Sequence, residues 1–351
     1  MVISPFLQAL LSSAGLAGYE SPVAELIHRE WASLADSIHQ SRLGSVHALH
    51  RGQAAEPRPS LLISAHMDAI GMMVAGLEQG FLRLTPIGGV DPRILPGQAV
   101  IVHAKRPLAG VIVTRPLDLL PDDANKDLPT WDHLLVDLGL PARQVDQLVR
   151  PGHLVSFANP PIELGDQLIC GHSLDNRVSV AALTHALELL RGRQHAWDVW
   201  FAATVQEEVT FAGAATSTFA LQPNLAVIVD VTHARSPGVQ SWQAFPLGEG
   251  PTLGIGPHVH PHLFKRLRAL ADELEIPYTI EPMPVSSGTE AAAVQVAREG
   301  VPTAVISIPL RYMHTPVEVV ALTDVQRCAR LLVELAVRLE PNTLQQVTWD
   351  D

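Results

Sequence analysis

The hydrophobic pattern of this chain changes twice along its 351 residues, and that change constrains the fold more than any other feature. From residue 166 onward, apolar runs typical of buried strands alternate with amphipathic helical segments, which indicates an α/β sheet covered by helices. Between about 71 and 161 the runs are short, alternate in polarity and are punctuated by Gly and Pro, which favours a β-rich barrel or sandwich. We therefore predict one α/β domain, built from residues 1–69 and 164–351 and interrupted by a β-rich insert at 70–163.

The expected elements follow from hydrophobic spacing and from Gly and Pro at the boundaries. We predict a first amphipathic helix that stops near Gly18 and a second at about 21–35. Strands of the α/β domain are expected at 61–65, 197–205, 225–231 and 303–308. Its later helices are expected at 178–190, 211–220, 262–274, 289–298 and 325–339. Short strands of the insert are expected at 71–77, 81–84, 99–104, 110–113 and 153–158, and an Asp-rich stretch at 118–130 is expected to be a long loop.

Composition excludes several classes of protein. The net charge of −12 and the pI of about 5.7 argue against nucleic acid as a partner, since phosphate binding needs clustered Lys and Arg. The chain offers no stretch near the ~20 apolar residues of a membrane span, and its N-terminus lacks the basic region of a signal peptide. Cys170 and Cys328 form no CxxC motif and are expected to be reduced thiols. We therefore expect a cytoplasmic protein.

Metal-ligand-type side chains stand in five short motifs, most of them where a predicted strand ends. Ligands of α/β sheets collect beyond the carboxyl ends of the strands, so these motifs are expected to converge on one edge. Two His and three carboxylates can hold two divalent ions with one carboxylate shared, and a spare carboxylate, Glu207, can then handle protons. The five ligand candidates are His66, Asp175, Glu208, Asp230 and His314.

Two motifs carry further detail. On an extended segment, residues two apart point to the same side, so Asp68 is expected to accept a hydrogen bond from the His66 ring and to fix its tautomer. Glu207 and Glu208 follow an apolar run; on an extended segment they would face opposite ways, one toward a metal and one toward the substrate. Each motif alone has an ordinary alternative, such as an exposed loop or a helix N-cap. Only the ligand interpretation explains all of them together.

Other motifs are weak. GxSxG, P-loop and HExxH motifs are absent, and Gly254-Ile-Gly256 lacks the third glycine of a dinucleotide fingerprint. His258-Val-His260-Pro-His262 has alternating histidines but no adjacent carboxylate, so we expect a role at the surface or at a helix entry.

In these motifs the chain resembles the M42 family of metallo-aminopeptidases, whose members form tetrahedral particles. The resemblance covers nearly the whole chain. It rests on Ala17-Gly18-Tyr19-Glu20, Ala65-His66-Met67-Asp68-Ala69-Ile70-Gly71, Gly88-Gly89-Val90-Asp91, Leu174-Asp175-Asn176-Arg177, Gln206-Glu207-Glu208-Val209, Asp230-Val231-Thr232 and Arg311-Tyr312-Met313-His314-Thr315-Pro316-Val317-Glu318.

The resemblance implies a mixed-sheet zinc-exopeptidase domain with an inserted barrel-like domain that serves subunit contacts in a homododecamer. It implies two divalent ions, zinc or cobalt, with a bridging water activated by Glu207, and peptide substrates with a free N-terminus. The implied roles are a bridge for Asp175, one metal site completed by His66 and Asp230, the other by Glu208 and His314, and support of His66 by Asp68.

The chain departs from the family pattern in two places. Ser287-Gly288-Thr289-Glu290 stands where the family often has Gly-Gly-Thr-Asp, and we expect the longer Glu290 to alter recognition of the substrate N-terminus or the depth of the pocket. Ala69 stands where the family is often acidic.

Two other functions stay open at this point. A related two-metal deacylase would use the same ligands on N-acylated amino acids. A glycan hydrolase fits less well, because glycosidases need two carboxyls about 5–9.5 Å apart and usually aromatic platforms.

Overall fold

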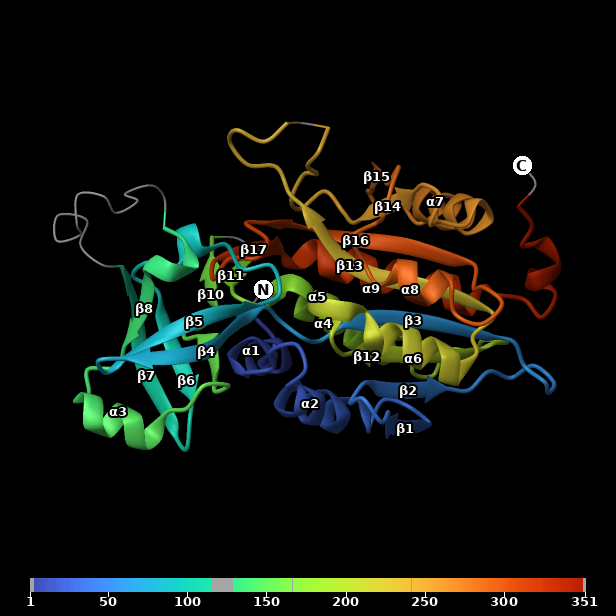
Figure 1. Cartoon of the computed structure of the whole chain (residues 1–351). Helices are drawn as coiled ribbons and strands as arrows, with labels where there is room; N and C mark the ends of the chain where they lie inside the picture. The colour runs from blue at the N-terminus through green and yellow to red at the C-terminus, as the bar shows by residue number, and fades with distance from the viewer. Residues whose placement is uncertain (1–2, 115–128, 166, 241, 350–351) are drawn as a thin grey trace.

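A large mixed sheet forms the centre of the α/β domain (Figure 1). The computed structural model describes residues 3–114, 129–165, 167–240 and 242–349. The 11-stranded sheet has the order β1-β2-β12-β3-β13-β16-β17-β11-β10, and β14 and β15 join it beside β16. Its strands are β1 (Ser37–Gln40), β2 (Val46–His50), β3 (Ser60–His66), β10 (Ile162–Leu164), β11 (Leu168–Gly171), β12 (Asp198–Thr204), β13 (Leu225–His233), β14 (Thr252–Ile255), β15 (Thr279–Pro282), β16 (Thr303–Arg311) and β17 (Glu318–Ala321).

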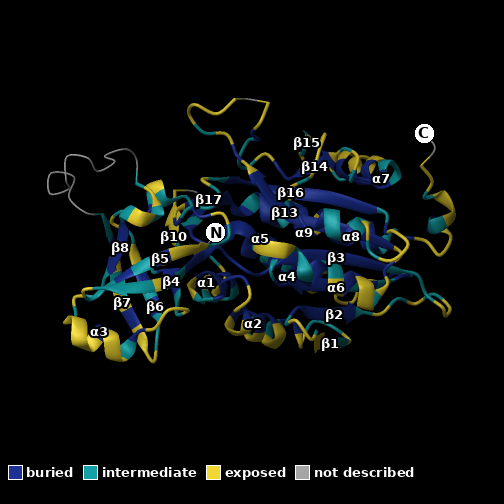
Figure 2. Cartoon of the chain, in the orientation of Figure 1, coloured by how far each residue is buried: buried dark blue, intermediate teal, exposed yellow. Residues whose placement is uncertain are grey.

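Four neighbouring strands, β12, β3, β13 and β16, run parallel, so their carboxyl ends meet at one edge of the sheet. These strands are apolar and almost fully buried, as expected for strands covered on both faces (Figure 2). The register places Thr204 beside His66 and Asp230 beside Ser307. The predicted strands therefore do end together at one edge of the sheet.

Helices cover the sheet in two layers. The long helices α4 and α9 pack against each other and against β3 and β16, while α6 and α8 pack together in front of the same strands (Figure 1). The helices of this domain are α1 (Pro5–Ser12), α2 (Ser21–Trp31), α4 (Leu174–Leu190), α5 (Glu207–Thr210), α6 (Ala212–Leu221), α7 (Pro261–Glu273), α8 (Ala291–Gln295) and α9 (Leu322–Val337), and a short 3-10 turn follows at η4 (Thr343–Gln346).

The β-rich region is a closed antiparallel barrel at one end of the molecule (Figure 1). Its strand order is β4-β5-β8-β7-β6-β9, and its apolar residues form a core separate from that of the large sheet. The barrel elements are β4 (Gly71–Glu78), β5 (Phe81–Ile87), η1 (Pro92–Ile94), β6 (Ala99–His103), β7 (Pro107–Thr114), η3 (Trp131–His133), β8 (Leu134–Asp137), α3 (Ala142–Leu148) and β9 (Leu154–Phe157). The inserted barrel is confirmed; the exact boundaries at 70 and 163 stay a prediction. The loop expected at 118–130 lies almost wholly outside the described residues.

The first helix ends earlier than predicted. It stops at Ser12 rather than near Gly18, and Leu16 instead forms a β-bridge with Ala69. The buried Arg177 explains this, because its guanidinium donates hydrogen bonds to the carbonyls of Leu10, Ser13 and Gly15. The side chain of Arg177 thus supplies the hydrogen bonds that these carbonyls would receive from backbone N–H groups in a longer helix.

The structure also bears on the cysteines and on membrane spans. Cys170 and Cys328 are both free. None of the helices in the described ranges combines the length and apolar character needed to cross a bilayer.

Candidate metal centre

The structure brings all seven predicted site residues together at the carboxyl edge of the parallel strands. They come from several kinds of position in the fold. His66 is the last residue of β3, Asp230 lies within β13, and Asp175 lies in the non-helical lead-in of α4. His314 lies in the turn between β16 and β17. The others, Asp68, Glu207 and Glu208, lie just beyond the ends of β3 and β12.

One detail of the sequence argument is wrong. Glu207 and Glu208 do not lie on an extended segment; they open the short helix α5. Their carboxylates nevertheless separate: Oε2 of Glu207 is 3.8 Å from Nε2 of His66, whereas Oε2 of Glu208 is 3.4 Å from Nε2 of His314. The two adjacent residues therefore serve the two ends of the cluster.

Asp175 lies between the two histidines. Its Oδ1 is 3.3 Å from Nε2 of His66 and its Oδ2 is 3.3 Å from Nε2 of His314. Asp230 approaches His66 from the other side, with Oδ1 3.8 Å from Nε2. A carboxylate that presents one oxygen to each of two imidazoles has the arrangement needed to bridge two cations.

Two overlapping groups of three side chains have ligand atoms within 4.8 Å of one another. One group contains Glu207 and Asp230 and the other contains Asp175 and Glu208; His66 belongs to both. Distances alone therefore do not separate Glu207 from the ligand candidates, and the base role predicted for it stays a prediction.

The buried carboxylates of this cluster lack sufficient positive charge. Burial raises the pKa of Glu207 and of Glu208 to about 8 each, and it raises the pKa of Asp230 well above its usual range. The pKa of Asp175 is instead lowered, because hydrogen bonds from His314 and His66 outweigh the effect of burial. In return, Asp175 raises the pKa of His314 to about 9. A buried cluster of carboxylates of this kind is stable in its ionised form only if cations neutralise its charge.

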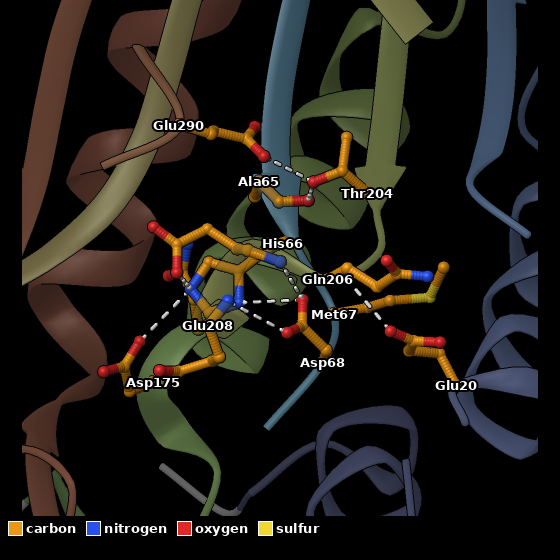
Figure 3. A network of polar contacts seen from close by, with 12 residues as sticks. Glu20, Ala65, His66, Met67, Asp68, Asp175, Thr204, Gln206, Glu208 and Glu290 are labelled. Carbon is orange, nitrogen blue, oxygen red and sulfur yellow. Dashed lines mark hydrogen bonds and ion pairs between the residues drawn. The ribbon is translucent and has the colours of Figure 1, made fainter. Parts of the chain in front are cut away.

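Asp68 supports the site differently from the prediction. Its Oδ1 lies 3.5 Å from Nδ1 of His66, longer than an ordinary hydrogen bond, and this Nδ1 has no hydrogen-bond partner among the described residues. The two oxygens of the fully buried carboxylate instead accept hydrogen bonds from the backbone N–H groups of Glu207 and Glu208, at 3.0 and 3.1 Å (Figure 3). Asp68 thus fixes the turn that carries both glutamates.

We expect Asp68→Asn to weaken metal binding or activity by about 10–100-fold. An amide offers one acceptor oxygen where two backbone donors point, so its NH2 group would face an N–H group and displace the turn. Isothermal titration calorimetry with the metal measures the change in affinity. Asp198→Asn is the matched control, since Asp198 also accepts a backbone N–H, from Gly52, but begins β12 at the far end of that strand. An unchanged metal titration in Asp68→Asn would contradict the assigned role.

A second buried carboxylate, Glu318, acts like Asp68 on the other half of the site. Its Oε1 accepts a hydrogen bond from the backbone N–H of His314 at 3.0 Å, and its Oε2 accepts one from Asp175 at 3.2 Å. The sequence analysis assigned it no role, although it closes the last motif of the resemblance. Gly89 was also missed: a Cβ there would lie 2.5 Å from Nδ1 of His314, so only glycine lets the barrel approach this ring.

Backbone strain concentrates at this edge. Ser173, Gln206, Tyr312 and His314 all adopt positive φ, between 61° and 62°, although none is glycine. Each lies within two residues of a predicted ligand or is one. Non-glycine residues in this conformation persist where surrounding structure holds them, and they cluster at functional sites.

The structure places Glu290 outside the cavity wall, while its effect on recognition of the substrate N-terminus stays a prediction. Glu290 is 1% exposed and does not line the cavity. Its carboxylate accepts a hydrogen bond from the hydroxyl of Ser64 at 2.5 Å and another from the hydroxyl of Thr204 at 2.5 Å, the second of which is drawn in Figure 3. The Glu290 carboxylate therefore joins Ser64 of β3 to Thr204 at the end of β12, and it is not part of the cavity wall. His260, as expected for a helix entry, caps α7 by accepting from the backbone N–H of His262.

A cavity of about 340 Å³ opens above the cluster. Its walls combine six of the predicted site residues with side chains from β13, β15, β16 and the loops beside them. Besides those six, the lining residues are Phe211, Val231, Thr232, His233, Glu281, Met283, Ser287, Gly288, Thr289, Ser307 and Met313. The cluster is therefore open to a small molecule or to a chain end.

Known proteins share this sequence and fold over nearly the full length. The chain is 33% identical over 347 residues to a lysyl aminopeptidase of Pyrococcus furiosus, covering 97% of this chain and 99% of the relative. The TET aminopeptidase of Thaumarchaeota archaeon SCGC AB-539-E09 superposes with a TM-score of 0.92 at 27% identity, covering 98% of each chain. The TET1 peptidase of Pyrococcus horikoshii, described as able to assemble into a tetrahedron or a large octahedral shell, superposes with a TM-score of 0.83 at 28% identity, covering 95% and 99%.

The family profile described as M42 glutamyl aminopeptidase matches residues 44–331. That span includes the inserted barrel and all seven residues of the candidate metal centre. The chain therefore belongs to the M42 family of metallo-aminopeptidases.

Proposed function

We propose that this aminopeptidase uses two divalent ions, zinc or cobalt, to remove residues one at a time from peptides with a free N-terminus. The observation that carries the proposal is Asp175, which presents one oxygen to each histidine of the cluster. His66 and Asp230 would complete one metal site, and Glu208 and His314 the other.

The residues present fit such ions. The donor set is two imidazoles and carboxylates, which suits zinc and cobalt. The site is buried and its carboxylates exceed its histidines, so cations would neutralise charge that the chain itself does not. Nδ1 of His66 lies toward Asp68, which leaves Nε2 of the ring toward the cluster.

The chain's own residues would have separate roles in the reaction. When bound, a pair of divalent ions polarises a carbonyl and lowers the pKa of a bound water from 15.7 toward about 7. Glu207 lines the cavity and would take a proton from the attacking water and return it to the leaving nitrogen. Asp68 and Glu318 hold the backbone of Glu207, Glu208, Asp175 and His314 in place.

The test is a pool of peptides, each present in free and N-acetylated form. The pool is incubated with metal-stripped protein and then with zinc- or cobalt-reloaded protein, and it is followed by mass spectrometry. We expect metal-dependent, stepwise loss of first residues from the free peptides alone. Removal of acetyl groups would instead indicate a deacylase, and no change under either metal would contradict the proposal.

We also propose that the barrel makes the subunit contacts of a twelve-subunit tetrahedral particle. The barrel has its own core, so it can be removed without opening the core of the large sheet. Replacing residues 70–163 by a short linker is expected to convert a large particle into small oligomers or aggregates. Analytical ultracentrifugation measures the change, and circular dichroism checks that the α/β domain is folded. Assembly is measured rather than activity, because deleting the insert also removes Gly89, which lies against the ring of His314. An intact large particle would refute the assembly role.

A further inference from the structure

The cavity extends from the metal ligands to a second polar group, centred on Glu281. Among the described residues that line the cavity, Glu281 is the carboxylate outside the predicted ligands and base, and no Lys or Arg is present. Its Oε1 accepts a hydrogen bond from the hydroxyl of Thr232 at 2.6 Å, and its Oε2 accepts one from Thr252 at 2.5 Å. Its side chain is therefore held in place within the wall.

Strand register fixes how far this group lies from the metal ligands. β13, β16 and β14 are neighbours in the sheet (Figure 1). Asp230 of β13 is opposite Ser307 of β16, and Ser307 is opposite Thr252 of β14, so their side chains share one face of the sheet. Each step is one strand spacing of about 4.8 Å. Thr252, which donates to Glu281, thus lies ~10 Å across the sheet from Asp230. A strip of polar side chains leads from the candidate metal centre to Glu281.

Within the described residues, two groups in this strip are incompletely satisfied: Glu281 lacks an opposite charge, and the Ser307 hydroxyl lacks a hydrogen-bond partner. Hydroxyl donors orient the carboxylate of Glu281 but carry no charge, and no ion pair joins it to a Lys, Arg or His in the described part of the chain. The hydroxyl of Ser307 lines the cavity, is 1% exposed and has no hydrogen-bond partner there. A buried hydroxyl without a partner is unfavourable, so Ser307 points to a ligand that supplies a hydrogen bond. Glu281 is only partly buried and already accepts two hydrogen bonds, but among the described residues it lacks an opposite charge, which a cationic ligand would supply.

The rest of the wall suits an aliphatic chain. Met283, which is 6% exposed, lines the cavity beside Glu281, and Phe211 and Met313 add further apolar surface. Lys and Arg have this same division into an apolar stem and a cationic end. An acidic side chain would instead be repelled by Glu281.

The α-ammonium of a substrate is a poorer candidate for this carboxylate. It is separated by one carbon from the carbonyl that is attacked, so it must stay beside the metal ligands. The side chain of the first residue can extend along the polar strip.

We propose that Glu281 selects peptides whose first residue is lysine or arginine, by binding the side-chain cation with its carboxylate. This inference rests on the proposed aminopeptidase function. Glu281 is then a specificity-determining residue and takes no part in the chemical step.

The experiment compares lysine and norleucine 4-nitroanilides, whose side chains share the same stem and differ in the terminal amine. Wild-type protein should show a ratio of kcat/KM for lysine over norleucine of about 10–100. Glu281→Gln keeps the size of the side chain and should bring this ratio close to one. Glu275→Gln removes an exposed carboxylate that lies outside the cavity wall and should leave the ratio unchanged.

Three results would overturn the inference. One is a wild-type preference for norleucine or for glutamate over lysine. Another is an equal loss on both substrates in Glu281→Gln, as expected if Glu281 only held Thr232 and Thr252 in place. The third comes from calorimetry with lysinamide and norleucinamide, which needs no turnover. If wild type hydrolyses neither substrate, the proposed function fails, while Glu281-dependent tighter binding of lysinamide would still support the inference and equal binding would overturn it.

Discussion

Replacing Glu207 with Gln should leave the metals in place and lower kcat by roughly 10²–10⁴ or more. The glutamine has the same size and can accept a hydrogen bond, but it cannot carry a proton from the attacking water to the leaving nitrogen. The buried position strengthens the expectation. Burial raises the pKa of Glu207 to about 8, and bound cations would lower it again, so loading the site favours the ionised base at neutral pH.

The adjacent residue provides the contrast that makes this result informative. Glu208→Gln removes a predicted ligand whose Oε2 lies 3.4 Å from Nε2 of His314, so it should lose metal as well as activity. Stoichiometry by mass spectrometry of the metals and steady-state kinetics are measured on both variants. Full activity of Glu207→Gln would rule out its role as base. Loss of metal in Glu207→Gln would instead identify Glu207 as a ligand, which is possible because it forms a candidate metal-binding group with His66 and Asp230.

Local patterns were sufficient to predict the parts of the fold that depend on local sequence. The apolar run before His66 and the run before Glu207 both form buried parallel strands, so their polar neighbours lie at the predicted edge. The alternation between residues 71 and 161 likewise predicted the barrel. Short strands were missed. β1 has the sequence Ser-Ile-His-Gln and is partly exposed, so it carries neither an apolar run nor a clear alternation.

Residues that act across long sequence separations could not be predicted. The hydrogen bond from Asp175 to Glu318 spans 143 positions, and the bonds from Arg177 to the end of the first helix and the segment after it span more than 160. No periodicity or spacing encodes such pairs; they exist only once the strands have paired. Glu290 illustrates the reverse error. A departure from a motif next to cavity residues suggested a role in the cavity, yet this buried side chain binds Ser64 and Thr204 and lies outside the cavity wall.

Replacing Asp175 with Asn is expected to remove the metals from both sites. Asp175 is the carboxylate with an oxygen near each histidine, and its ionised form is the one that the two histidines stabilise. A neutral amide offers one oxygen, so it cannot serve both positions, and the remaining carboxylates would hold two ions less tightly. Since metal polarisation contributes several kcal/mol to the transition state, activity should fall by about 10³-fold or more.

Metal content after exhaustive dialysis is the primary measurement, and thermal unfolding with and without added zinc is the second. Wild type should be stabilised by zinc, because an ion that binds only the folded state shifts the unfolding equilibrium; Asp175→Asn should not be. Asp324→Asn is the control for loss of a buried carboxylate. Asp324 is fully buried and accepts the backbone N–H groups of Gly248 and Gly250, but it does not line the cavity, so this variant should keep its metals even if it unfolds earlier. If Asp175→Asn retained two ions per chain, the bridge would have to be assigned to another carboxylate, and Glu207 would be the first to test because it shares the neighbourhood of His66 and Asp230.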